Sequence, residues 1–115
     1  MSIQILHNPR CSKSRQTLAL LEENGVTPEI VEYLKTPPTV EELASIVNKL
    51  GVSIRDIIRT KEAEYKEVGA DNDALTDAEI AALLVATPKL IERPIVINGD
   101  KAAVGRPPEN VLAII

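Results

Sequence analysis

The chain has 115 residues, of which 44% are hydrophobic and 26% are charged, and its formal net charge is −4. This composition is typical of a single globular domain. Two tyrosines are the only aromatic residues, so the stacking platform of a single-strand nucleic-acid binder is missing, and the acidic balance also argues against nucleic acid as a partner. Neither a run of about 18 apolar residues nor an apolar signal region occurs, so we expect a cytoplasmic protein without a membrane partner.

Cys11 is the only cysteine of the sequence. An internal disulfide is therefore impossible, and a structural zinc site built from cysteines alone is excluded. We expect no metal and no bound cofactor. Any disulfide chemistry at Cys11 must end on the thiol of another molecule.

The N-terminal third of the sequence predicts a βαβ unit. A short apolar run at 3–6 is typical of a buried strand, and 12–24 carries apolar residues at helical spacing with Gly25 as the C-cap. Residues 29–34 partly alternate and predict a second strand. A strand, a helix and a strand within about 35 residues imply parallel pairing with a right-handed crossover.

The middle of the chain predicts helices only. In three places a hydroxyl residue is followed three positions later by an acid, the capping pattern of a helix start: Thr39 with Glu42, Ser53 with Asp56, and Thr76 with Glu79. The second of these predicts a short helix that ends near Arg59. We therefore expect a helical insertion at about 37–91.

The last part of the chain predicts a β-hairpin followed by a helix. Residues 95–97 and 101–104 flank Asn98-Gly99, and Pro107 or Pro108 can start a helix that runs to Ile114. The whole order fits a mixed four-stranded sheet in one domain, 1–115. Spacing is compatible with an α/β or an α+β class, and the thioredoxin architecture with a helical insertion between its β-α-β and β-β-α halves is the most economical fit.

Cys11 lies where a strand has ended and a helix begins. Unpaired N–H groups and the helix dipole favour a thiolate there, and Arg10, Lys13 and Arg15 add positive charge within one turn. This predicts a nucleophile; the alternative is a small buried hydrophobe. A phosphatase loop is excluded, because the position that would need arginine is Thr17.

Four further residues are candidates for the same site. His7, the only histidine, precedes Cys11 by four positions and is either a partner of the thiolate or a buried loop residue. Arg59, Arg93 and Arg106 each lie at a boundary between predicted elements. Singly they fit solvated surface charges, but together they would make a fork-shaped site for a tetrahedral oxyanion. Arg93-Pro94 also suggests a cis peptide bond.

The segment from His7 to Arg15 (HNPRCSKSR), together with Arg59, ERPIV at 92–96 and GRP at 105–107, resembles the glutaredoxin-coupled arsenate reductase family. The resemblance implies a thioredoxin-like fold in which Cys11 attacks arsenate and Arg59, Arg93 and Arg106 hold the oxyanion. It implies that His7 and Ser14 tune the ionisation of the cysteine and that Pro94 is the cis proline. Glutathione as co-substrate and glutaredoxin as partner would supply the electrons to a monomer.

Two other functions stay open at this point. Ser12-Lys13 replaces the Gly-Thr usual in arsenate enzymes, and the chain is similar to the short members of the family. One alternative is therefore a glutathione-dependent monothiol reductase that acts on mixed disulfides or on another oxyanion. The other is a transcriptional regulator similar to Spx, but Ser14 stands where the second cysteine of its redox switch would be.

Overall fold

The chain divides into two units in the computed structural model, which describes residues 2–115. One unit comprises Met1–Thr36 with Arg93–Ile115, and the other is Pro37–Glu92. The second unit nearly coincides with the residues 37–91 for which the sequence predicts an insertion. That both units together make one domain stays a prediction. Within residues 2–115, no helix combines the length and the apolar character that crossing a membrane requires.

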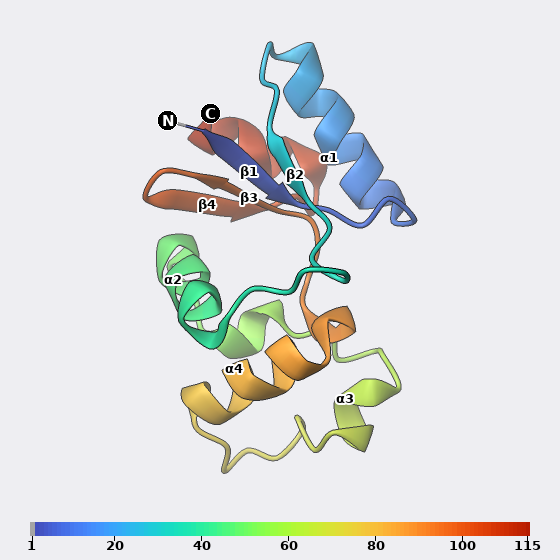
Figure 1. Ribbon diagram of the computed structural model, residues 1–115, viewed down its shortest axis with the longest axis vertical. Helices are drawn as coiled ribbons and strands as arrows, with labels where there is room; N and C mark the ends of the chain where they lie inside the picture. The colour runs from blue at the N-terminus through green and yellow to red at the C-terminus, as the bar shows by residue number, and fades with distance from the viewer. Residues whose placement is uncertain (1) are drawn as a thin grey trace. The chain divides into compact units, whose positions relative to one another are not determined.

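The first unit contains a four-stranded mixed sheet (Figure 1). Its strands are β1 (Ile3–Leu6), β2 (Glu29–Val31), β3 (Ile95–Asn98) and β4 (Lys101–Val104), in the order β2-β1-β3-β4. β1 pairs parallel to β2 and antiparallel to β3, which in turn pairs antiparallel to β4. The predicted mixed α/β sheet and its βαβ crossover are thereby confirmed.

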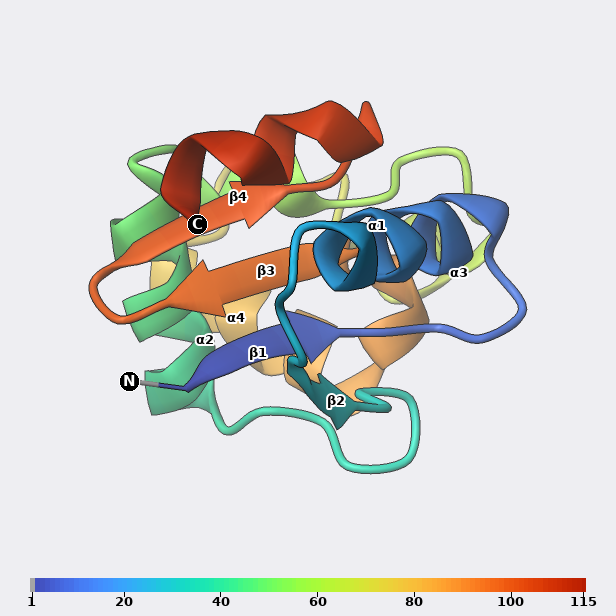
Figure 2. The ribbon, with the colours of Figure 1, turned by 90° about the horizontal axis from the view of Figure 1, so that it is seen from above.

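The register of the sheet decides which loops meet. Leu6, the last residue of β1, lies opposite Val31 and Ile95, and Ile95 lies opposite Val104. One edge of the sheet, formed by the strand ends, therefore carries the end of β1, the end of β2, the start of β3 and the end of β4. The loops that follow β1 and β4 and the segment that precedes β3 all leave from this edge (Figure 2).

Two helices cover one face of this sheet. They are α1 (Ser12–Glu23) and the 3₁₀ helix η3 (Pro108–Ile114), which pack against each other (Figure 2). Ile5, Leu21, Val96 and Val111 form their fully buried core with the sheet. Each such side chain contributes about 1.5–3 kcal/mol on burial, so this aliphatic cluster fixes the position of α1 on the strands.

Three details of the first unit refine or differ from the predictions. β2 ends at Val31 rather than at 34, because Glu32 accepts the N–H groups of Lys35 and Thr36 and turns the chain. α1 ends at Glu23 with Asn24 as its cap, and Gly25 follows at φ 78°. The last helix runs from Pro108 to Ile114 as predicted, with Pro107 as its N-cap, but its hydrogen bonds make it a 3₁₀ helix, a type that the prediction did not specify.

The named elements of the second unit are all helices, as predicted. It contains α2 (Val40–Leu50), η1 (Ile54–Ile57), α3 (Glu64–Glu67), α4 (Asp77–Ala86) and η2 (Pro88–Leu90). All three capping boxes are present, and Leu43 and Ile46 of α2 are buried. The short helix ends at Ile57, slightly before Arg59, because Ile58 forms an antiparallel bridge with Ile91.

Candidate active site

The loop between β1 and α1 is held by one asparagine. The carbonyl of Asn8 accepts the N–H of Cys11 at 2.9 Å, and its side-chain Oδ1 accepts the N–H of Arg10 at 3.0 Å. The N–H of Asn8 donates to the hydroxyl of Ser14 at 3.3 Å. These bonds close a tight turn of the kind that asparagine stabilises, and they deliver Cys11 to the start of α1.

Cys11 is the N-cap residue of α1, as the sequence predicts. Its sulfur is half-buried, and this burial by itself opposes ionisation. The N–H and hydroxyl of Ser14, the side chain of Arg93 and the N–H of Lys13 outweigh that effect and lower the pKa of Cys11 to about 7. The contacts of the two N–H groups fall short of the geometry of a full cap hydrogen bond. A substantial fraction of the sulfur is therefore thiolate at neutral pH.

Arg106 is one of the cations that contact this sulfur. Its Nη2 lies 3.5 Å from Sγ of Cys11, and its Nε donates to the carbonyl of Arg93 at 2.8 Å. One guanidinium thus bridges the thiol and the backbone that leads into β3. Guanidinium donors in this fork arrangement suit an oxyanion as well as a thiolate.

Arg93 is the second cation at the sulfur. Burial opposes its charge, but hydrogen bonding to Cys11 and the nearby Tyr33 raise the pKa of Arg93 above its ordinary value. Arg93 and Arg106 thus meet Cys11 because the start of β3 and the end of β4 share the sheet edge at which β1 ends. All three residues lie at boundaries between elements, and that these two arginines hold an oxyanion stays a prediction.

Tyr33 belongs to the site but is not among the predicted residues. The sequence assigns it to a strand, whereas it lies in the turn after β2, fully buried, and hydrogen bonds to Arg93. Tyr33 is one of only two aromatic residues in the sequence, and the hydroxyl of a buried tyrosine requires a hydrogen-bond partner. That scarcity is the one signal by which the sequence marks this position.

Pro94 is buried and lies close to Gly105, the residue that follows β4. Its peptide bond with Arg93 is cis, as the sequence suggests, and the Arg106–Pro107 bond is cis as well. The N–H of Gly105 donates to the carbonyl of Pro94 at 2.9 Å. A Cβ on Gly105 would lie 2.5 Å from Oγ1 of Thr17 and 2.8 Å from Cγ of Pro94. Glycine is thus required here for close approach of three segments.

Ser14 and His7, the two residues expected to tune the cysteine, differ in their relation to it. Ser14 is fully buried and contacts the sulfur through its hydroxyl. His7 is also buried, which lowers its pKa; Glu32 opposes and Arg15 reinforces this effect. Within residues 2–115, neither a hydrogen bond nor an ion pair joins His7 to the sulfur. The influence of His7 on Cys11 stays a prediction.

Arg59 lies in the second unit, after the short helix η1. Its Nη1 forms an ion pair with Oε1 of Glu92 at 3.0 Å, and both side chains are about a quarter exposed. Its N–H donates to the carbonyl of Leu90 at 2.8 Å. These bonds fix Arg59 within its own unit, and its convergence on Cys11 stays a prediction.

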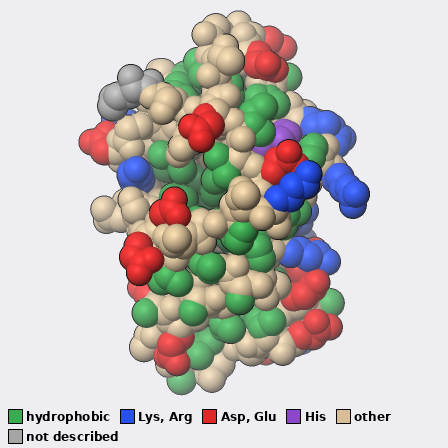
Figure 3. All heavy atoms as spheres, in the orientation of Figure 1, with side chains coloured by type: hydrophobic (Ala, Val, Ile, Leu, Met, Phe, Trp, Pro, Cys, Tyr) green, Lys and Arg blue, Asp and Glu red, His purple; other side chains and the backbone are tan. Residues whose placement is uncertain are grey.

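The surroundings of Cys11 are strongly cationic although the chain as a whole is acidic. Arg10 and Arg15 lie exposed on the loop and first turn, and Arg15 Nη1 donates to the carbonyl of Pro9 at 2.9 Å. Figure 3 shows Lys and Arg side chains gathered beside the single histidine on this side of the first unit. Residues 2–115 hold no group of three or more His, Cys, Asp or Glu side chains that would bind a metal ion. The arrangement suits a nucleophilic thiolate that meets an anion.

Comparison with known proteins identifies the family. The sequence model of the ArsC family matches residues 6–114. The chain is 53% identical to the arsenate reductase of Haemophilus influenzae over the whole of both chains. It is 49% identical to the uncharacterized protein YfgD of Escherichia coli, covering 98% of this chain and 96% of that protein. The structure of the arsenate reductase of Vibrio cholerae superposes with a TM-score of 0.97 at 49% identity, covering 100% of this chain and 98% of that one. The chain belongs to the ArsC family, with its thioredoxin-like fold.

Proposed function

We propose that this protein is an oxidoreductase that reduces arsenate to arsenite through a thiol-arsenate adduct on Cys11, with glutathione and glutaredoxin as reductants. The observation that carries the proposal is the sulfur of Cys11, whose pKa is about 7 and which Arg93 and Arg106 contact. A thiolate and guanidinium donors at one point are what nucleophilic attack on an oxyanion requires. Relatives that share about half of their residues with this chain carry the name arsenate reductase.

The first step forms the sulfur–arsenic bond. The thiolate of Cys11 donates its electron pair to As(V), one As–O bond breaks, and the leaving hydroxide takes a proton and departs as water. Arg93 and Arg106 offset the charge of the incoming anion, which would otherwise be repelled by the thiolate. In this scheme Arg59 supplies a third cation.

The second step reduces arsenic at the expense of two thiols. Glutathione thiolate forms a disulfide bond with the sulfur of Cys11, while the electron pair of the S–As bond stays on arsenic and arsenite leaves. Glutaredoxin then resolves the mixed disulfide and returns Cys11 to its thiolate. The external reductants are needed because the chain has one cysteine. No bound cofactor takes part, and a monomer in the cytoplasm suffices.

Arsenite production tests the proposal directly. The purified protein is supplied with arsenate and either glutathione with glutaredoxin or thioredoxin with its reductase. We expect turnover with the first pair, none with Cys11→Ser, and little with thioredoxin, because the chain offers no second cysteine for intramolecular release. Equal rates in wild type and Cys11→Ser would reject arsenate reduction at Cys11. Turnover with thioredoxin and its reductase alone would reject glutathione and glutaredoxin as the reductants.

A second candidate is a monothiol reductase of glutathione mixed disulfides. The observation in its favour is the hydroxyl of Ser14, which contacts the sulfur of Cys11. Ser14 lies three residues after Cys11, at the position where a dithiol enzyme has its second cysteine. Arg93→Ala and Arg106→Ala discriminate. If both variants keep disulfide reduction and lose arsenate turnover, the oxyanion is the substrate; if both activities survive, the disulfide is the better assignment.

A further inference from the structure

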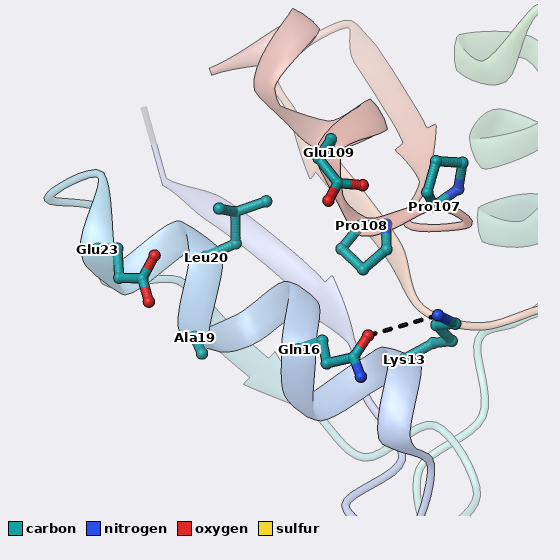
Figure 4. A pocket seen from close by; sticks show the side chains of 8 residues that line it. All are labelled: Lys13, Gln16, Ala19, Leu20, Glu23, Pro107, Pro108 and Glu109. Atoms are coloured by element: carbon teal, nitrogen blue, oxygen red, sulfur yellow. Dashed lines mark hydrogen bonds between the residues drawn. The ribbon is translucent and has the colours of Figure 1, made fainter.

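A groove runs along the first unit beside the candidate active site. It has a volume of about 450 Å³ and lies between α1 and the segment 107–109 that opens η3 (Figure 4). Its lining comprises Lys13, Gln16, Ala19, Leu20, Glu23, Pro107, Pro108 and Glu109. Neither the arsenate chemistry nor the arginines at the sulfur use this groove.

Both walls of the groove begin at residues connected to the sulfur. On one wall, the N–H of Lys13 contacts the sulfur of Cys11. On the other, Pro107 directly follows Arg106, whose guanidinium lies 3.5 Å from the same sulfur. The end of the groove formed by Lys13 and Pro107 is therefore linked to the surroundings of the sulfur, through the N–H of Lys13 and through Arg106.

The chemistry of the walls is mixed, with both signs of charge. Buried Pro108 and half-buried Leu20 supply apolar surface. Lys13 supplies a cation, whose Nζ lies 3.5 Å from Oε1 of Gln16, and Glu109 supplies a carboxylate from the opposite wall (Figure 4). Glu23 adds a second carboxylate about 15 Å further along α1. This pattern fits a ligand that carries an anion and a cation on an apolar stem.

We propose that the groove is the binding subsite for the γ-glutamyl arm of glutathione. This inference rests on the proposed function, in which glutathione attacks Cys11. The γ-glutamyl end is the part of glutathione with both a carboxylate and an ammonium group, which Lys13 and Glu109 complement. The glycine end carries a carboxylate alone, and the acidic side chains would repel it. A tripeptide extends over about 10 Å, so the groove accommodates one arm while the thiol stays at Cys11.

Formation of a mixed disulfide with oxidised glutathione isolates this subsite from arsenate and glutaredoxin. In that reaction the thiolate of Cys11 attacks one sulfur of the disulfide, a new S–S bond forms, and reduced glutathione leaves. The adduct is followed by intact mass on the full chain. We expect the rate to saturate with oxidised glutathione and to stay linear with cystamine, which lacks the γ-glutamyl arm.

Two charge-removing variants and two matched controls locate the subsite. We expect Lys13→Gln and Glu109→Gln each to raise the half-saturating concentration about fivefold, as removal of one charge contact at the protein surface does. Lys101→Gln and Asp100→Asn remove exposed charges of the β3–β4 hairpin and should leave that concentration unchanged. Rates are normalised to iodoacetamide alkylation of the same variant, so that altered reactivity of the sulfur is not mistaken for altered binding.

Three outcomes would overturn the inference. One is a linear dependence on oxidised glutathione up to its solubility limit. Another is equal half-saturation in Lys13→Gln and Lys101→Gln. The third concerns the arm: the disulfide of γ-glutamylcysteine, which lacks glycine, should saturate like glutathione, and a large loss would assign the groove to the glycine arm. Saturation without arsenate turnover would reject the proposed function and keep the subsite.

Discussion

The guanidinium of Arg106 lies 3.5 Å from the sulfur of Cys11, although 95 positions separate the two residues in the sequence. The sheet brings them together, since the end of β1 and the end of β4 both border the start of β3. The same guanidinium donates to the carbonyl of Arg93 over 2.8 Å. Arg106 therefore couples the sulfur of Cys11 to the backbone that carries the second arginine.

Arg106→Lys should separate charge from geometry at this site. A lysine ammonium keeps the charge but lacks the fork that serves the Arg93 carbonyl and the sulfur at once. Loss of one charge-assisted hydrogen bond predicts a fall in kcat/KM for arsenate of about tenfold or more. Arg10→Lys, at an exposed loop position, is the control and should stay near wild type. A wild-type kcat/KM in Arg106→Lys would show that charge alone is sufficient.

Ser14→Ala should raise the pKa of Cys11. Burial disfavours the thiolate, and the hydroxyl and N–H of Ser14 are among the contacts that offset it and lower this pKa to about 7. The rate of iodoacetamide labelling should therefore rise with pH around a midpoint near 7 in wild type. In Ser14→Ala the midpoint should move toward the free-thiol value of about 8.5. Ser12→Ala, which removes an exposed hydroxyl next to the cysteine, should keep the wild-type midpoint.

The same ionisation predicts how stability varies with pH. The pKa of Cys11 is lower in the folded state than in the unfolded chain, so the unfolded state binds more protons between the two values. The contribution of the thiolate is present above the unfolded pKa and is lost as the pH falls through about 7. Denaturant titrations should show the free energy of unfolding of wild type rising relative to Cys11→Ser from pH 7 upward. Parallel curves would mean that the two states bind the proton equally.

Gly105→Ala should destabilise the first unit. The added methyl group would lie 2.5 Å from Oγ1 of Thr17 and 2.8 Å from Cγ of Pro94, and both of these residues are buried. Overpacking of this kind costs about 1–3 kcal/mol, measurable as a lower free energy of unfolding. Because Thr17 supplies two of the three close atoms, the double variant with Thr17→Ala should lose less than the two single changes together. If the free-energy losses of the two single variants add exactly in the double variant, the strain does not arise from the contact between position 105 and Thr17.

Thr→Val substitutions at positions 17 and 39 should change stability in opposite directions. Oγ1 of Thr17 is buried without a hydrogen-bond partner among the described residues, so an isosteric methyl should stabilise by about 1 kcal/mol. Thr39 is the exposed N-cap of α2, and its hydroxyl accepts the N–H of Glu42 at 3.1 Å. Its loss should destabilise by about 1 kcal/mol. Thermal unfolding of both variants gives the comparison, and a loss at position 17 would reveal a partner for the hydroxyl.

Local chemistry accounts for what the sequence predicted well. The three capping boxes, the apolar strand 3–6 and the hairpin at 95–104 depend on residues within a few positions of each other, and the structure contains all of them. Cys11 at a helix start is of the same kind. Ends of elements were less predictable: β2 stops at Val31 because Glu32 caps a turn, which no alternation of apolar residues indicates.

Long-range contacts explain what the sequence did not predict. Tyr33 joins the site through Arg93, which lies 60 positions away, and only the parallel pairing of β2 with β1 brings its turn to that edge. Similarly, the close packing of Gly105, Thr17 and Pro94 depends on three segments that meet in space. Boundary positions indicated Arg93 and Arg106, but their contact with the sulfur required the register of the sheet.

His7 should remain neutral at physiological pH, and its buried position should make the folded state less stable in acid. Burial lowers its pKa; the carboxylate of Glu32 opposes this effect and Arg15 reinforces it. Since His7 is the only histidine, its ring gives a single titrating signal in proton NMR, and we expect a midpoint below the ordinary value of about 6.5. The unfolded chain then binds this proton more readily, so the free energy of unfolding should fall as the pH drops below about 6.5. In His7→Asn that part of the acid sensitivity should disappear, whereas an NMR midpoint above 6.5 would show that Glu32 dominates and would reverse the sign.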